Sequence, residues 1–269
     1  MPSCYTHHIY SEQVLHALPK QYREIIQRHK ELFAWGTEGP DLFFFFMPGF
    51  YMNPVCKLGF QMHRRPGQDF FQSAAKVLRE DGFPEAELSY LYGFLTHFVL
   101  DRICHEKIYR AVEEGIASHN EIETEVDRAL LVKEGKDPVT ASRVSFLESQ
   151  KEYAELISRF FPFPASVVKI SMDSAIRDRR LITTSSRKKR KALYGLMKFC
   201  HVYDWMHGVI VNRRPSQVCA GTTQMLLQTM YDAVPTAVNL IREFQSTAEG
   251  RKPWNPFYQD DFCGNYYRK

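Results

Sequence analysis

Residues 93–105 read GFLTHFVLDRICH, a largely apolar segment in which His97, Asp101 and His105 stand four residues apart. In an α-helix, residues four apart lie on one face, and each such step overshoots a full turn by only about 40°. The three side chains therefore form a slowly twisting column along a predicted helix. An unpaired aspartate among Phe and Leu side chains is costly to bury, so the pattern favours a metal ion or a basic partner at Asp101.

The same spacing recurs at the start of the next predicted helix, where residues 119–123 read HNEIE. His119 and Glu123 again stand four residues apart. Imidazole nitrogen and carboxylate oxygen are typical zinc ligands. Five such residues exceed the needs of one ion, so the two motifs together predict two or more ions, with Asp101 as the candidate bridge between them. Clustered metal ions of this kind favour phosphate chemistry.

Further candidate ligands stand upstream of this helix pair. They are His7 or His8 near the N-terminus, Asp41 in the turn Gly39-Pro40-Asp41, and His63 in the segment QMHR. The spacing of these residues does not select among them. A lone histidine is more often a hydrogen-bonded core residue than a ligand, so each of these positions is a weaker candidate than the column.

Helical periodicity extends over most of the chain, and strands of alternating polarity are almost absent. With no long Gly- or Ser-rich linker, this predicts a single all-α domain over residues 1–269, with a split near residues 162–164 as the alternative. The metal ligands fall within residues 1–135, and the C-terminal helices within 138–249 are expected to complete the fold and to add little to the site. A short first helix capped by Ser11 is followed by helices expected at 19–30, 66–80, from 84 through the metal motif, 118–134, 138–160, 166–179, 187–211 and 222–244.

The composition sets limits on the class of protein. The chain has 269 residues, of which 44% are hydrophobic and 25% charged, with a net charge of +4. This excludes disordered, collagen-like and disulfide-scaffold proteins. The six cysteines form no C-x-x-C pair, so we expect reduced thiols. No apolar stretch approaches the length of a membrane helix and the first ten residues lack the features of a secretory signal, which predicts a cytoplasmic protein without an integral membrane segment.

The order of these motifs resembles the zinc-dependent phospholipase C family. The opening Tyr5-Thr6-His7, the Gly39-Pro40-Asp41 turn, the single His63, the column and the His119–Glu123 pair follow the succession of ligands in that family, over about the first half of the chain. The resemblance implies an all-helical fold of the phospholipase C and single-strand nuclease type. It also implies hydrolysis of a phosphodiester by a metal-activated water, with zinc as the cofactor.

Carried over residue by residue, the resemblance implies two or three zinc ions. One is held by Asp41, His63, His97 and Asp101, a second by His105, His119 and Glu123, and a third by His7 and Asp101. The amine of Met1 or Pro2 is the candidate that completes the third site. Asp41 is also the candidate general base, because a carboxylate beside the attacking water can accept its proton.

The substrate stays open, and so does one alternative in which the protein is not an enzyme. A phospholipid at a membrane surface is the favoured phosphodiester partner, and nucleic acid is less favoured. The runner-up function is that of a zinc hydrolase resembling the single-strand nucleases or a phosphatase. The basic run at residues 187–191, RKKRK, is usually a solvated helix start, but it can also bind anionic lipid or nucleic acid. The aromatic residues around Asp41 are expected to pack beneath the site rather than contact lipid: Trp35, Phe43–Phe46, Phe50 and Tyr51. A non-catalytic helical protein stapled by zinc is the alternative from another class, and the oligomeric state is open.

Overall fold

The computed structural model of the chain describes residues 4–47 and 53–266, and within these ranges the fold is all-helical, as predicted. β-structure in that part is limited to an isolated bridge between Pro66 and Asp261. The α-helices are α1 (Cys4–Ala17), α2 (Lys20–Arg28), α3 (Lys30–Gly36), α4 (Pro54–His63), α5 (Gly67–Asp81), α6 (Glu85–Glu113), α7 (His119–Lys133), α8 (Lys151–Ser158), α9 (Ala165–Ile182), α10 (Arg187–Phe199), α11 (Tyr203–Met206) and α12 (Ala220–Ala248). Short 3-10 helices are η1 (Gly39–Phe45), η3 (His207–Val209) and η4 (Pro256–Gln259).

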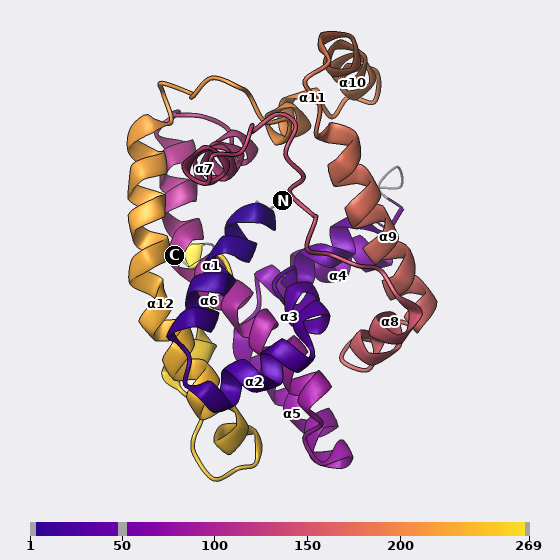
Figure 1. Ribbon diagram of the computed structural model, residues 1–269, viewed down its shortest axis with the longest axis vertical. Coiled ribbons are helices and arrows are strands. Elements are labelled where there is room, and N and C mark those ends of the chain that lie inside the picture. The colour runs from indigo at the N-terminus through magenta and orange to yellow at the C-terminus, as the bar shows by residue number, and fades with distance from the viewer. Residues whose placement is uncertain (1–3, 48–52, 267–269) are drawn as a thin grey trace.

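Helix α6 runs through the middle of the molecule and packs against α1, α3 and α12 (Figure 1). Pro84 precedes it, and two glutamates occupy its first turn, where carboxylates interact favourably with the helix dipole. Most of its residues from Leu88 to Leu100 are fully buried, so the helix is enclosed on nearly every face. The column of His97, Asp101 and His105 is consequently held away from bulk water.

Helix α7 begins at a capping box. The Ser118 hydroxyl accepts a hydrogen bond from the Glu121 backbone N–H, and the Glu121 carboxylate accepts one from the Ser118 N–H at 3.0 Å. This arrangement satisfies two backbone donors that a helix start otherwise leaves unpaired. It makes His119 the first residue of α7, as the sequence predicts.

Helices α3 and α6 cross at two glycines. A Cβ atom on Gly93 would lie 2.1 Å from the carbonyl oxygen of Phe33, and one on Gly36 would lie 2.1 Å from that of Tyr90. Only hydrogen fits at either position, so the two backbones approach each other directly. The crossing brings the residues that follow α3, including Thr37, up to His97.

Gly93→Ala is expected to lower the free energy of unfolding by about 3 kcal/mol, because the added methyl group forces the two helices apart. Gly195→Ala is the matched control, since that glycine lies inside α10 with open space around its Cβ position. For this control we expect no loss in the free energy of unfolding, and a gain of up to about 1 kcal/mol from helix propensity. Urea unfolding of both variants measures the difference, and equal losses would contradict the close crossing.

One predicted helix is wrong. Residues 138–160 were expected to be helical, but only α8 forms there, and residues 138–150 run in turns and irregular structure. Asp137 accepts a hydrogen bond from Val139 N–H at 3.0 Å, and Ser142 accepts one from Val144 N–H at 3.3 Å. Such local side-chain bonds compete with the helical hydrogen bonds. The segment is nevertheless anchored, because Val144 is buried in the core.

Other boundaries also differ from the prediction. Ser11 lies inside α1 rather than at its start, because Thr6 in its first turn is bonded to a distant aspartate. The expected helix at 187–211 ends at Phe199, and His201 follows with a left-handed φ of 55°. Helix α4 was not predicted, although Asn53 caps it by accepting hydrogen bonds from the N–H groups of residues 55 and 56. Seven residues of the expected loop at 36–53 form η1.

The hydrophobic core is continuous from α1 to the C-terminal segment, with a smaller cluster around Met197, Val209 and Ile210. Trp35, Phe43 and Phe45 are buried, which confirms the expected packing for these residues. Phe50 and Tyr51 lie outside the described residues. No helix in the described part of the chain combines the length and the apolar character needed to cross a membrane.

Candidate metal centre

The eight side chains predicted as ligands come together from five helical segments. His7 comes from α1, Asp41 from η1 and His63 from α4, while α6 and α7 supply the rest, in three groups whose ligand atoms lie within 4.8 Å of one another. The alternative His8 is not part of these groups and stacks on Phe146, with ring centroids 3.7 Å apart. The amine of Met1 or Pro2 lies outside the described residues.

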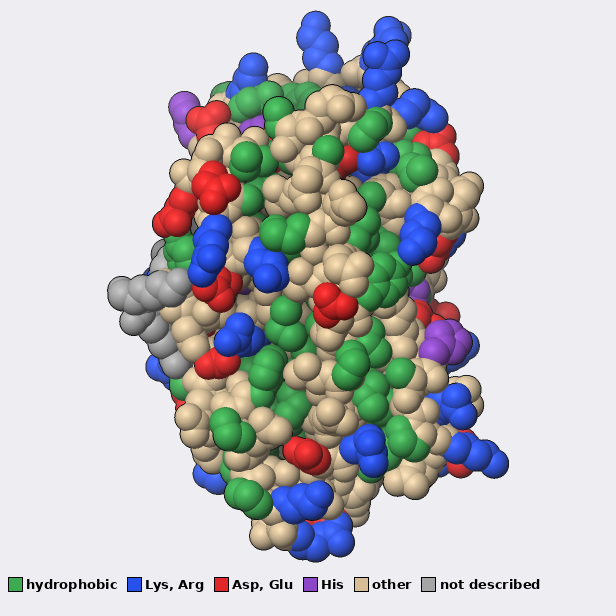
Figure 2. All heavy atoms as spheres, turned by 90° about the vertical axis from the view of Figure 1, so that its left-hand side faces the viewer, with side chains coloured by type: hydrophobic (Ala, Val, Ile, Leu, Met, Phe, Trp, Pro, Cys, Tyr) green, Lys and Arg blue, Asp and Glu red, His purple; other side chains and the backbone are tan. Residues whose placement is uncertain are grey.

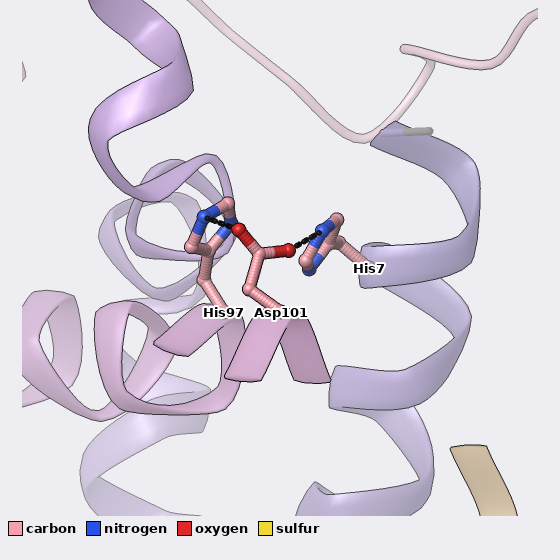
Figure 3. Close-up of side chains that lie close together, drawn as sticks. All are labelled: His7, His97 and Asp101. Atoms are coloured by element: carbon pink, nitrogen blue, oxygen red, sulfur yellow. Dashed lines mark ion pairs between the residues drawn. The ribbon is translucent and has the colours of Figure 1, made fainter. Parts of the chain in front are cut away.

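The first group contains His7, His97 and Asp101 (Figure 3). Asp101 Oδ1 lies 3.1 Å from His7 Nε2, and Asp101 Oδ2 lies 3.1 Å from His97 Nε2. The two imidazole rings stack with centroids 4.3 Å apart and an angle of 16° between their planes. The carboxylate thus points between a histidine of its own helix and one from α1.

The second group contains Asp41, His63 and His97. His63 Nε2 lies 3.0 Å from Asp41 Oδ1 and 3.5 Å from Asp101 Oδ2. Asp101 Oδ2 also lies 3.6 Å from His105 Nδ1. Asp101 therefore stands within ion-pair distance of four histidines and adjoins all three groups.

The third group contains His105, His119 and Glu123. Glu123 Oε1 lies 2.8 Å from His119 Nε2 and 3.4 Å from His105 Nε2. The His119 side chain is 25% exposed, whereas those of His105 and Glu123 are 5% and 7% exposed. The centre is therefore most open to solvent at His119, the first residue of α7.

Backbone carbonyl groups orient three of the imidazoles. The Nδ1 atoms donate hydrogen bonds as follows: His63 to Gly59 O at 2.7 Å, His97 to Thr37 O at 3.0 Å, and His105 to Phe262 O at 2.9 Å. A proton on Nδ1 leaves the lone pair on Nε2, which is the atom that faces the carboxylates. Hydrogen bonding of this kind from the second ring nitrogen is the usual support of metal-ligating histidines.

The donor atoms fit zinc. A buried polar atom without a hydrogen bond is costly, and native proteins seldom leave one. Here the three groups contain several such atoms: Asp41 Oδ1, His97 Nε2, Asp101 Oδ2 and Glu123 Oε2. A cavity of about 30 Å³, lined by His7, Asp101, His105 and Glu123 among others, has room for a water-sized particle. Imidazole and carboxylate are the ligands that zinc takes at sites open to water.

Comparison with known proteins identifies the family. The family model described as zinc-dependent phospholipase C matches residues 6–163, which is more than half of the chain and includes all eight side chains. The chain belongs to the zinc-dependent phospholipase C family. No curated protein and no solved structure matches it. Helices α9 to α12 lie beyond the matched residues.

Without metal, His63 and His105 of the centre hold protons at neutral pH. Burial lowers the pKa of His63, but the neighbouring carboxylates of Asp101 and Asp41 outweigh burial and raise it to about 10. Burial likewise opposes protonation of His105, yet the charges of Asp101 and Glu123 raise its pKa to about 9. Burial raises the pKa of Glu123, but the neighbouring histidines hold it well below its usual range. A metal ion must displace the imidazole protons in order to bind.

Metal-free protein is therefore expected to lose stability as the pH rises above about 6.5, the pKa of histidine in an unfolded chain. The folded pKa values of His63 and His105 lie above that value, so their stabilisation is complete below it and is lost as the pH rises through about 9 to 10. The loss should be on the order of 1 kcal/mol per pH unit. Urea unfolding at several pH values, with a chelator and with zinc, measures this loss of stability. The same dependence of stability on pH in both conditions would contradict an origin in the histidine protons.

The sequence analysis missed the residues that hold His7 in place. Asp127 Oδ1 accepts hydrogen bonds from the Thr6 N–H and from the Thr6 hydroxyl, each at 2.8 Å. Asp127 Oδ2 lies 3.4 Å from Arg143 Nη1, and both side chains are buried. These contacts attach the start of α1 to α7. A signal existed, since Asp127 continues the fourfold spacing of His119 and Glu123.

The support behind Asp41 comes from the C-terminal half, which was expected to add little. Arg179 of α9 forms a buried ion pair with Glu38 at 2.6 Å and stacks over the Phe45 ring at 4.4 Å. Between Glu38 and Asp41, Gly39 has a φ of 53°, and a Cβ atom there would lie 2.3 Å from the His97 ring. These contacts fix η1 against α6. No local sequence signal links Arg179 to this turn.

Proposed function

We propose that the protein is a zinc-dependent phosphodiesterase of the phospholipase C type, which hydrolyses the phosphodiester of a phospholipid at a centre of two or three zinc ions. The observation that supports this most directly is the position of Asp101. Its two carboxylate oxygens face different histidines within 3.6 Å, as a carboxylate shared between ions requires. The family match supports the same assignment.

We assign the ligands as the resemblance implies, with His97 shared between two of the three groups and placed with Asp41 and His63. Asp41, His63, His97 and Asp101 hold one ion, His105, His119 and Glu123 hold a second, and His7 with Asp101 holds a third. When bound, zinc supplies positive charge that favours ionisation of water and balances the charge of the phosphate oxygens. The amine of Met1 or Pro2 stays the predicted completion of the third site.

We assign Asp41 as the general base. Asp41 Oδ1 is buried, accepts no hydrogen bond and lies 3.0 Å from His63 Nε2. In this role the carboxylate takes the proton of the attacking water. The backbone bonds of the imidazoles keep their Nε2 atoms aimed into the centre throughout. His119, at the open side, is the ligand that an incoming phosphodiester meets first.

The test measures zinc per chain together with hydrolysis of a soluble nitrophenyl phosphodiester and of phosphatidylcholine in micelles. We expect two or three zinc ions, with both activities lost in chelator and restored by zinc. Bound zinc without hydrolysis of either substrate would favour the alternative of zinc as a structural staple. Cleavage of single-stranded DNA in preference to phosphatidylcholine would favour the nuclease alternative.

We also infer that residues 1–269 form one domain. The continuous core supports this, because it joins residues as distant as Cys4 and Phe262, and the pair of Glu38 with Arg179 connects the two halves across the segment 162–164. The cytoplasmic location stays a prediction from the sequence.

A further inference from the structure

Helix α10 concentrates positive charge at one end of the molecule. Its sequence, RKKRKALYGLMKF, contains six basic residues and no acidic one. In Figure 1 it lies at the top, with α11 beneath it, and Figure 2 shows Lys and Arg side chains projecting from that same end. The family match does not reach this helix.

One face of α10 is fixed to the rest of the chain. Arg190 donates hydrogen bonds of 2.6 Å to the Val211 carbonyl oxygen and to Asn212 Oδ1. Met197, two turns later, is buried against Val209 and Ile210. The rotation of the helix about its axis is therefore determined, and the opposite face is left towards solvent.

The outward face changes character along its length. Lys188 and Lys191 are exposed in the first two turns, and apolar side chains follow at the same helical spacing. Phe199 is 82% exposed and Leu196 is 58% exposed. No other large hydrophobic side chain in the described part of the chain is as exposed as Phe199. A basic start followed by exposed apolar residues is typical of helices that lie at a membrane interface.

The positive charge of this face is not balanced within the described residues. Some lysines elsewhere on the surface pair along their helices, as Lys151 does with Glu155 and Lys169 with Asp173. No ion pair within 4.0 Å forms at Lys188 or Lys191 among the residues that the structure describes. An anionic surface would supply the missing countercharge.

The segment that carries α10 adjoins the open side of the metal centre. After α10 the chain passes through α11 to η3, which packs on α7. His207 Nε2 lies 3.4 Å from Glu121 Oε1, two residues after His119. A surface bound by α10 would consequently lie on the same side of the molecule as the entrance at His119.

We propose that α10 docks on membranes containing anionic phospholipids, with Phe199 and Leu196 inserted between acyl chains and Lys188 and Lys191 against the headgroup phosphates. This inference extends the proposed function. Only the role of α10 in presenting phospholipid to the centre rests on that function. Nucleic acid fits less well, because single strands bind through successive stacked aromatic side chains and α10 exposes a single aromatic ring.

The test uses the full-length, zinc-loaded protein and co-sedimentation with vesicles of phosphatidylcholine, with and without phosphatidylserine. We expect binding that requires phosphatidylserine and weakens with salt. The charge variant Lys188→Gln/Lys191→Gln should bind about 25-fold more weakly, at about fivefold per lysine. The apolar variant Leu196→Ser/Phe199→Ser should bind at least about tenfold more weakly.

Matched controls separate docking from folding and from catalysis. Lys20→Gln/Lys76→Gln neutralises two exposed lysines on α2 and α5, at the other end of the molecule in Figure 1, and should bind like the wild type. Lys188→Arg/Lys191→Arg should retain binding. Hydrolysis of the soluble diester should be unchanged in every variant, whereas hydrolysis in phosphatidylserine vesicles should fall in parallel with binding.

Three results would overturn the docking proposal. They are equal binding to vesicles with and without phosphatidylserine, wild-type binding by both the charge and the apolar variants, and binding of a single-stranded oligonucleotide that displaces the protein from vesicles. Vesicle binding by a protein that hydrolyses no phosphodiester would instead contradict the proposed function and leave the docking surface standing. Hydrolysis of the soluble diester without vesicle binding would contradict the docking surface and leave the proposed function standing.

Discussion

Asp101→Asn is expected to lower zinc content by at least one ion per chain and kcat/KM for a soluble phosphodiester by at least about a thousandfold. Asp101 is 3% exposed and stands within 3.6 Å of four histidine side chains. The amide keeps the shape of the carboxylate but removes the charge and the second shared oxygen. Each group that relies on that oxygen then loses a ligand.

Zinc analysis by atomic emission and kinetics on the same preparation check this prediction. Asp232→Asn is a matched control, because Asp232 is exposed on α12 and its hydrogen bond from Gln228 can also be made to an amide oxygen. We expect wild-type zinc and activity in the control. Full zinc content and full activity in Asp101→Asn would contradict both the bridge and the function proposed for the centre.

Asp41→Asn is expected to lower kcat by about a hundredfold to ten-thousandfold while most of the zinc is retained. The amide oxygen can still contact an ion beside His63 and His97, but an amide cannot accept the proton of water at neutral pH. The position of η1 should not change, because the pair of Glu38 with Arg179 and the packing of Phe45 are left intact.

The measurement is kcat as a function of pH, together with zinc content. Removal of the general base also removes the acidic limb of the pH profile, whereas a loss of packing alone would leave that limb in place. Asp69→Asn is the control, since Asp69 also lies in the first turn of a helix, at the exposed surface of α5. Loss of zinc in proportion to activity would make Asp41 a ligand only, and unchanged kcat would exclude it as the base.

Much of the centre could be predicted because its motifs are local. The fourfold spacing of His97, Asp101 and His105 places three candidate ligands on one face of α6 without any information about the rest of the fold. The capping box at Ser118 is equally local and sets His119 at the start of α7. The resemblance supplied His7, Asp41 and His63, which spacing alone did not select.

The errors fall where distant contacts or local side-chain hydrogen bonds outweigh helical periodicity. The segment 138–150 has helical periodicity, yet turn-forming bonds at Asp137 and Ser142 prevail and the chain is held by burial of Val144. The first helix extends upstream of Ser11, where Asp127 of α7 binds Thr6. The first outcome depends on competition between side-chain and helical hydrogen bonds, and the second on a residue far away along the chain. Helical periodicity registers neither.

The sequence by itself determined the helical class, the two ligand motifs and the basic composition of α10, because each depends on residues within a few turns of one another. The tertiary structure decided which histidine near the N-terminus joins the centre and which carbonyl groups orient the imidazoles. It also decided that Arg179 supports the turn of Asp41 and that α10 turns Phe199 towards solvent. Most of those features depend on contacts between segments far apart along the chain, such as the 157 residues between His105 and Phe262, or on the rotation of a helix set by packing, and helical periodicity does not encode such contacts.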